Sequence, residues 1–122
     1  MMYQDIKERT FNYAVRIAEL SKFLYRKKEN YVLANQVFRS GTSIGANVEE
    51  AAASYSRDEY MYKMNIALKE ARETHYWLRV VRGSSILEAE RMDALVCETD
   101  EIKKVLGAIV SKLRKTSKTI PR

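Results

Sequence analysis

The sequence predicts an all-α protein, an antiparallel up-down four-helix bundle that assembles as a homo-oligomer. Apolar residues recur every three or four positions in four successive segments, as they do on one face of an α-helix. The only proline is Pro121, so no proline interrupts a long helix within this 122-residue chain. No segment shows the alternating pattern of a half-buried strand. Long helices joined by short turns are typical of an up-down bundle.

The first predicted helix spans residues 3–27 and the second spans residues 30–54. The first ends in three consecutive cations, which suit the negative end of a helix dipole. Asn30 stands where a side chain can cap the second helix. The apolar positions are Ile6, Tyr13, Ile17, Leu20 and Leu24 in the first helix, and Leu33, Val37, Ile44, Val48 and Ala51 in the second.

The third predicted helix spans residues 57–82 and the fourth spans residues 86–115. The letters SRDE at 56–59 and SILE at 85–88 both have the spacing of a capping box, in which a serine and a glutamate satisfy the first free backbone amides. Gly83 is expected to end the third helix. The bundle therefore occupies residues 1–116, and residues 117–122 form a basic C-terminal tail.

The stretch RSGTSIGANVEEAAA, residues 39–53, contains two glycines that look like loop residues, but the apolar phase of the second helix passes through it unbroken. Each glycine costs a helix interior about 1 kcal/mol relative to alanine. Gly41 and Gly45 lie four residues apart, a spacing that lets two helix backbones approach closely. Ser43 and Asn47 form a neighbouring polar row that we expect to hydrogen-bond across this contact.

The residue inventory disfavours an enzyme, a metal site or a cofactor site. His75 is the only histidine, Cys97 is the only cysteine, and Arg72 stands where a Glu-x-x-His pair would need its glutamate. Gly41 and Gly45 have the wrong spacing for a phosphate-binding P-loop. A Ser-His-Asp set is not excluded by counting, because its members need not be neighbours in sequence. A single cysteine and the lack of a long apolar run favour a cytoplasmic protein.

The net charge of +6 and the isoelectric point near 9.5 favour an acidic partner, nucleic acid first. Basic residues cluster at the end of the first helix, along the third, and near the C-terminus, where no acid follows Glu101. In an up-down bundle, the first and last of these clusters lie at opposite ends. The candidate nucleic-acid-binding residues are Lys22, Arg26, Lys27, Lys28, Arg72, Arg79, Arg82, Lys103, Lys104, Lys112, Arg114 and Lys115. Aromatic residues that could stack on bases are Tyr25, Tyr31, Tyr76 and Trp77.

Apolar residues also extend beyond the stripe that a four-helix core requires, which favours self-association. The additional positions are Phe11, Ala14, Val15, Ala18 and Phe23 in the first helix, and Val96, Val105 and Val110 in the fourth. A helix-turn-helix reading of residues 38–52 is a competing hypothesis. It is disfavoured because Glu49 and Glu50 stand where DNA phosphates require cations.

The stretch NQVFRSGTSIGANVEEAAASYSRDEY, residues 35–60, resembles the signature of bacterial four-helix-bundle proteins related to the 23S ribosomal-RNA intervening-sequence protein. The matching positions are Gln36, Arg39, Ser40, Ser43, Ile44, Asn47 and Glu50, followed by Ser56, Glu59 and Tyr60. The resemblance implies a homopentamer with no established enzymatic activity. Relatives include the accessory variability determinant of diversity-generating retroelements, a basic pentamer that binds nucleic acid and a reverse transcriptase.

The leading functional hypothesis is therefore a non-enzymatic oligomeric bundle that binds RNA or DNA, accessory to a nucleic-acid enzyme such as a reverse transcriptase. The alternative is a protein–protein adaptor without nucleic-acid binding. In that case Gln36, Arg39, Ser40, Gly41, Ser43, Ile44, Gly45, Asn47, Glu49 and Glu50 would serve the assembly.

Overall fold

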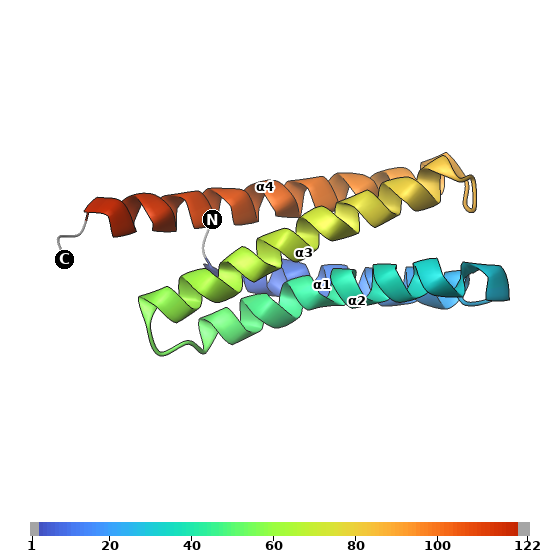
Figure 1. Ribbon diagram of the computed structural model, residues 1–122. Helices are drawn as coiled ribbons and strands as arrows, with labels where there is room; N and C mark the ends of the chain where they lie inside the picture. Colours follow the sequence, from blue (N-terminus) through green and yellow to red (C-terminus); the bar gives the residue numbers. More distant parts are fainter. Residues whose placement is uncertain (1–2, 120–122) are drawn as a thin grey trace.

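The computed structural model describes residues 3–119, and the side chains of residues 6–116 among them. This part of the chain contains no strand and forms four long helices joined by short connections (Figure 1). The predicted all-α four-helix class is confirmed. The helices are α1 (Tyr3–Leu24), α2 (Tyr31–Ala52), α3 (Arg57–Gly83) and α4 (Ala89–Thr119), with a short 3-10 helix η1 (Lys28–Asn30) before α2.

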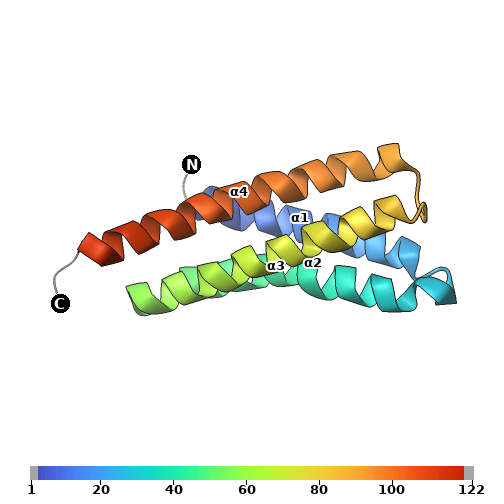
Figure 2. The same cartoon turned by 45° about the horizontal axis from the view of Figure 1, so that its top comes forward.

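Each helix runs antiparallel to the next, and the strongest packing follows chain order: α1 on α2, α2 on α3, and α3 on α4 (Figures 1 and 2). The contact that closes the bundle, between α1 and α4, is looser. Among the described side chains, two hydrogen-bonded pairs bridge it. Arg9 of α1 donates to both carboxylate oxygens of Glu98 at 2.7 and 2.8 Å, and the Tyr13 hydroxyl lies 2.5 Å from Thr99 Oγ1.

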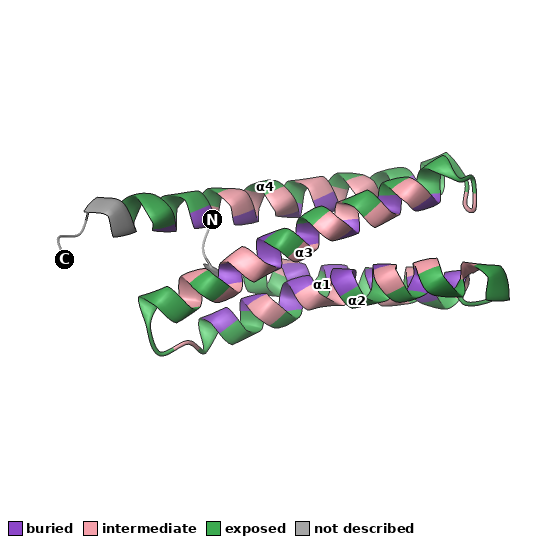
Figure 3. Ribbon diagram, viewed as in Figure 1, coloured by how far each residue is buried: buried purple, intermediate pink, exposed green. Residues whose placement is uncertain are grey.

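The buried faces follow the predicted apolar stripes, because each helix turns one stripe toward the bundle axis (Figure 3). Of the predicted positions in α1 and α2, all are buried except Leu20 and Leu33, which are half-buried against the core. Tyr13 is the bulkiest fully buried side chain, and burial raises the pKa of its hydroxyl. The core therefore runs the length of the bundle as one continuous cluster.

Gly41 and Gly45 lie on the side of α2 that faces α1, as the spacing predicts. A Cβ at Gly41 would lie 2.7 Å from Cγ2 of Ile17, and one at Gly45 would lie 3.1 Å from the backbone oxygen of Thr10. Both glycines are buried within an uninterrupted helix. Residues 39–52 therefore belong to a helix that packs closely on α1, and only Ala53 lies in the turn that follows.

The capping box at 56–59 is confirmed, because Ser56 Oγ accepts the Glu59 amide at 3.1 Å and Glu59 in turn accepts the Tyr55 amide at 3.0 Å. The capping box at 85–88 is wrong. Ser85 has a left-handed backbone (φ 59°) and lies in the turn, and α4 begins only at Ala89. In this turn it is therefore Ser85, and not Gly83, that adopts the left-handed backbone conformation.

The other differences are at helix ends. Helix α1 ends at Leu24, three residues before the predicted end, because the chain turns there and forms η1. Asn30 precedes α2, but its side chain makes no capping hydrogen bond. Helix α4 continues to Thr119, so the predicted division at residue 116 lies inside a helix, and residues 120–122 lie outside the described part. Within residues 3–119 no helix is both long and apolar enough to cross a membrane.

Candidate nucleic-acid interface

The structure separates the predicted basic residues into two clusters at opposite ends of the bundle, because α1 ends where α4 begins (Figure 1). Apart from the half-buried Lys103, all of the predicted cations are exposed. We define the loop-end cluster as Lys22, Arg26, Lys27, Lys28, Arg79, Arg82 and Arg91, and the C-terminal cluster as Arg57, Lys112, Arg114 and Lys115. Arg72, Lys103 and Lys104 lie near the middle of α3 and α4, between the two clusters.

The outer part of the C-terminal cluster has no carboxylate partner within the described residues. Lys112, Arg114 and Lys115 form no ion pair there, and Arg114 makes only a long hydrogen bond of 3.5 Å to the side chain of Asn65. Arg57, at the start of α3, reaches across and donates to the backbone oxygen of Leu113 at 2.9 Å. Arg57 is not among the predicted cations, because only the α3–α4 packing brings it beside the end of α4.

Lys103 and Lys104 are less available to bind a phosphate, because both already bind the carboxylate of Asp100 on the same helix, at 3.1 and 3.2 Å. These two hydrogen bonds hold the pKa of Asp100 below its usual value. Burial, together with the nearby Lys103 and Arg79, lowers the pKa of His75, which lies 4.0 Å from the same carboxylate. This part of α4 is a charge-balanced surface.

In the loop-end cluster, Arg82 is paired with Asp93 at 2.7 Å. Arg26 and Arg91 instead lie against one aromatic ring, with guanidinium carbons 5.0 and 5.3 Å from the centroid of Phe23. Neither arginine forms an ion pair in the described structure. Arg91 was missed in the sequence because it stands among acidic residues, and its position beside α1 depends on the fold.

The aromatic residues proposed for base stacking lie in two edge-to-face pairs. Tyr25 and Tyr31 have ring centroids 5.7 Å apart at the α1–α2 connection, and Tyr76 and Trp77 have centroids 5.1 Å apart on α3. Trp77 is half-buried, and its indole nitrogen donates to Glu73 at 2.9 Å. Its indole is therefore held by protein contacts.

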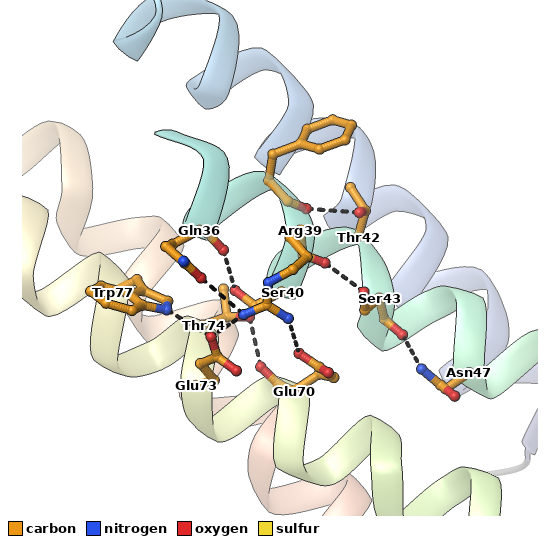
Figure 4. A network of polar contacts seen from close by, with 11 residues as sticks. Gln36, Arg39, Ser40, Thr42, Ser43, Asn47, Glu70, Glu73, Thr74 and Trp77 are labelled. Carbon is orange, nitrogen blue, oxygen red and sulfur yellow. Dashed lines mark hydrogen bonds and ion pairs between the residues drawn. The ribbon is translucent and has the colours of Figure 1, made fainter. Parts of the chain in front are cut away.

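The resemblance residues lie mainly on the α2–α3 contact, where Arg39 is the centre of a polar network (Figure 4). The Arg39 guanidinium donates to Gln36 at 3.1 Å and pairs with two carboxylates of α3, Glu70 at 3.3 Å and Glu73. Glu50 makes a second cross-helix pair, with Lys63 of α3 at 2.7 Å. These exposed pairs connect α2 to α3 outside the buried core. Their α3 partners were missed because nothing in the sequence marks which surface glutamates face α2.

The expected hydrogen bonding of Ser43 and Asn47 across the glycine contact is wrong. Ser43 Oγ donates to the Arg39 backbone oxygen at 2.5 Å, and Asn47 Nδ2 donates to the Ser43 backbone oxygen at 2.8 Å (Figure 4). Buried Ser40 similarly donates to the Gln36 oxygen at 2.8 Å. Short polar side chains in a helix bond the preceding turn when no partner is in reach. Ile44, the remaining motif residue, is a core residue.

Together these features define an all-α four-helix bundle with a basic surface. Within residues 3–119 no group of three or more His, Cys, Asp or Glu side chains could hold a metal ion, and Cys97 is an exposed free thiol. The chain belongs to the 23S rRNA-intervening sequence protein family, whose sequence model matches residues 3–108. The family resemblance of residues 35–60 is thereby confirmed.

A solved structure supports the same assignment. It is the crystal structure of a protein with unknown function from the S23 ribosomal protein family of Bacteroides thetaiotaomicron, 40% identical to this chain, with a TM-score of 0.85. The match covers 91% of this chain and 99% of that chain. A comparison with curated proteins finds no match.

Proposed function

We propose that this protein is a non-enzymatic bundle that binds nucleic acid, with the C-terminal cluster as its main contact surface. One observation carries the proposal: after Glu101 the sequence contains no acidic residue, and the exposed cations Lys112, Arg114 and Lys115 have no carboxylate partner in the described structure. Cations without an internal partner are free to replace the counterions of a phosphate backbone.

The placement of these cations along α4 also supports the proposal. Lys112 and Lys115 are three residues apart, so they lie on one face of α4. Arg57 adds a positive charge from α3 beside Leu113. Exposed cations from two helices can contact successive phosphates of a polyanion backbone.

The experiment is a salt series of binding to a labelled RNA hairpin and a labelled DNA duplex, read by fluorescence anisotropy. We expect the affinity to fall steeply between about 50 and 200 mM salt, with a log–log slope that becomes shallower by about 2 in Lys112→Gln/Lys115→Gln. The matched control, Arg16→Gln/Lys69→Gln, removes the same charge from exposed positions on α1 and α3. No binding at about 50 mM salt, or an equal loss in both variants, would refute the proposal.

A protein–protein adaptor is the second candidate, and the exposed apolar residues of α1 and α2 favour it. Phe11, Val15 and Phe38 are 57%, 45% and 44% exposed, and they lie on two helices that pack directly together. We propose that this surface, which we call the α1–α2 apolar face, contacts a second copy of the chain. Self-association is compatible with nucleic-acid binding, because the C-terminal cluster lies on α3 and α4 and not on α1 or α2.

A further inference from the structure

A cavity of about 460 Å³ opens at the end of the bundle where the two chain connections meet. Arg26, Lys27 and Asn30 line it from the α1–α2 connection, and Ser85 and Ile86 line it from the α3–α4 connection. Its volume is within the range of small-molecule sites, roughly 300–1,000 Å³. We call it the loop-end cavity.

Two cations, Arg26 and Lys27, line this cavity. The Arg26 guanidinium lies against the Phe23 ring that forms part of the wall, whereas Arg91 lies against the same ring but lines a separate cavity between α1 and α4. Like charges held close together are stabilised by a bound anion. Glu29 also lines the cavity, but within the described structure it pairs with none of these cations.

Two further polar side chains in the cavity wall, those of Asn30 and Ser85, make no hydrogen bond within the described residues that would prevent them from binding a ligand. The Asn30 side chain does not cap α2, although it stands at the capping position. The Ser85 hydroxyl has no hydrogen-bond partner in the described structure, and its backbone is in the left-handed region (φ 59°), which is unfavourable for serine. Since both residues line the cavity, an amide and a hydroxyl donor stand beside the cations.

We propose that the loop-end cavity binds the phosphate monoester of a nucleotide. Arg26 binds the phosphate oxygens through its planar guanidinium group, with Lys27 as a second cation. Asn30 and Ser85 donate further hydrogen bonds, and the organic part of the ligand packs on Phe23 and Ile86. A monoester is favoured over the phosphodiester of a chain interior, because it has a charge near −2 and three free oxygens.

The same chemistry is present in a free nucleotide and at the 5′-phosphate end of an RNA chain. The site goes beyond the proposed function, because it lies at the opposite end of the bundle from the C-terminal cluster (Figure 1). Binding of a polynucleotide interior along α4 and binding of a terminal phosphate at the connections are therefore separable.

The test is an NMR titration of the full chain with four probes: inorganic phosphate, AMP, and one short RNA carrying either a 5′-phosphate or a 5′-hydroxyl. We expect saturable shifts of the Asn30 and Ser85 amides with AMP, with the 5′-phosphate RNA, or with both. The effective probe identifies the source of the phosphate. Arg26→Gln/Lys27→Gln should weaken this binding by about tenfold or more, since each of these side chains supplies a charge-assisted hydrogen bond.

Lys112→Gln/Lys115→Gln is the matched control, and it should leave these shifts and their midpoint unchanged. Circular dichroism of each variant confirms that the bundle remains folded, and Asn30→Ala tests the site without a change of charge. The proposal is overturned if no phosphate probe shifts these amides. It is also overturned if the 5′-phosphate and 5′-hydroxyl RNAs behave alike and AMP is inert, or if folded Arg26→Gln/Lys27→Gln binds as the parent does. If only Lys112→Gln/Lys115→Gln loses RNA binding, the result supports the C-terminal cluster as an RNA-binding surface and contradicts phosphate binding by RNA at the loop-end cavity.

Discussion

Gly41 of α2 lies directly against Ile17 of α1, so closely that a Cβ at position 41 would stand 2.7 and 2.8 Å from the two γ-carbons of the isoleucine. One helical turn further on, Gly45 makes the same kind of contact with the Thr10 backbone. The two glycines therefore determine how closely α1 approaches α2. Their presence in the stretch 39–53 is explained by helix packing and not by a phosphate-binding loop.

Gly41→Ala should destabilise the protein even though alanine is the better helix former. The gain in helix propensity is about 1 kcal/mol, but a methyl group in this contact displaces Ile17 within a packed core, at about 1–3 kcal/mol. We expect a net loss of about 1 kcal/mol in the free energy of unfolding, measured by urea denaturation.

Gly107→Ala is the matched control, because Gly107 lies inside α4 and a Cβ there meets nothing within 4 Å. This substitution should stabilise the protein by up to about 1 kcal/mol. Opposite signs at the two glycines are the expected result. A stabilising Gly41→Ala would show that α1 and α2 are not in close contact in solution.

The Tyr13–Thr99 hydrogen bond should show strong coupling in a double-mutant cycle. Thr99 donates its own proton to the Leu95 backbone oxygen at 2.7 Å, so Tyr13 is the donor in the 2.5 Å bond between the side chains. Thr99→Val leaves a buried tyrosine hydroxyl unpaired, at about 1–3 kcal/mol, whereas Tyr13→Phe removes a donor and costs about 0.5–1.5 kcal/mol. The double variant should therefore lose less stability than the sum of the two. Simple additivity in urea unfolding would contradict the bond.

The Arg9–Glu98 pair should make stability depend on pH in the acidic range. The hydrogen bonds from Arg9 hold the pKa of Glu98 below its usual value of 4.5. Ionised Glu98 thus stabilises the fold above about pH 4.5, and this contribution is lost as the pH falls through the lowered pKa. Glu98→Gln should cost roughly 0.5–1 kcal/mol near neutral pH, and the difference from the parent should vanish in acid.

The control for this measurement is Glu49→Gln, which changes an exposed carboxylate without an ion pair in the described structure. It should give the same small difference from the parent across the pH range. A Glu98→Gln difference that stays constant from neutral pH into acid would mean that the pair does not form in solution.

Features set by neighbours in sequence could be predicted, and features set by the meeting of distant segments could not. The Ser56–Glu59 cap is local, so its spacing alone identifies it. The geometry of the α3–α4 turn depends on where both helices must pack. The left-handed backbone of Ser85 (φ 59°) therefore could not be predicted from the sequence, and the prediction of a capping box at this residue is wrong. Arg57 and Arg91 join their clusters for the same reason, through tertiary contacts.

The α1–α2 apolar face should mediate self-association. Phe11 and Val15 lie one turn apart on α1, and both are exposed although they are apolar. Phe11→Lys/Val15→Glu places opposite charges there without changing the net charge, so we expect a fall in molar mass by light scattering with the helical circular dichroism retained. The control is Tyr62→Ser, because Tyr62 is 63% exposed on α3 and lies outside this face. A parent chain that is monomeric, or a variant of unchanged mass, would remove the face as the site of assembly.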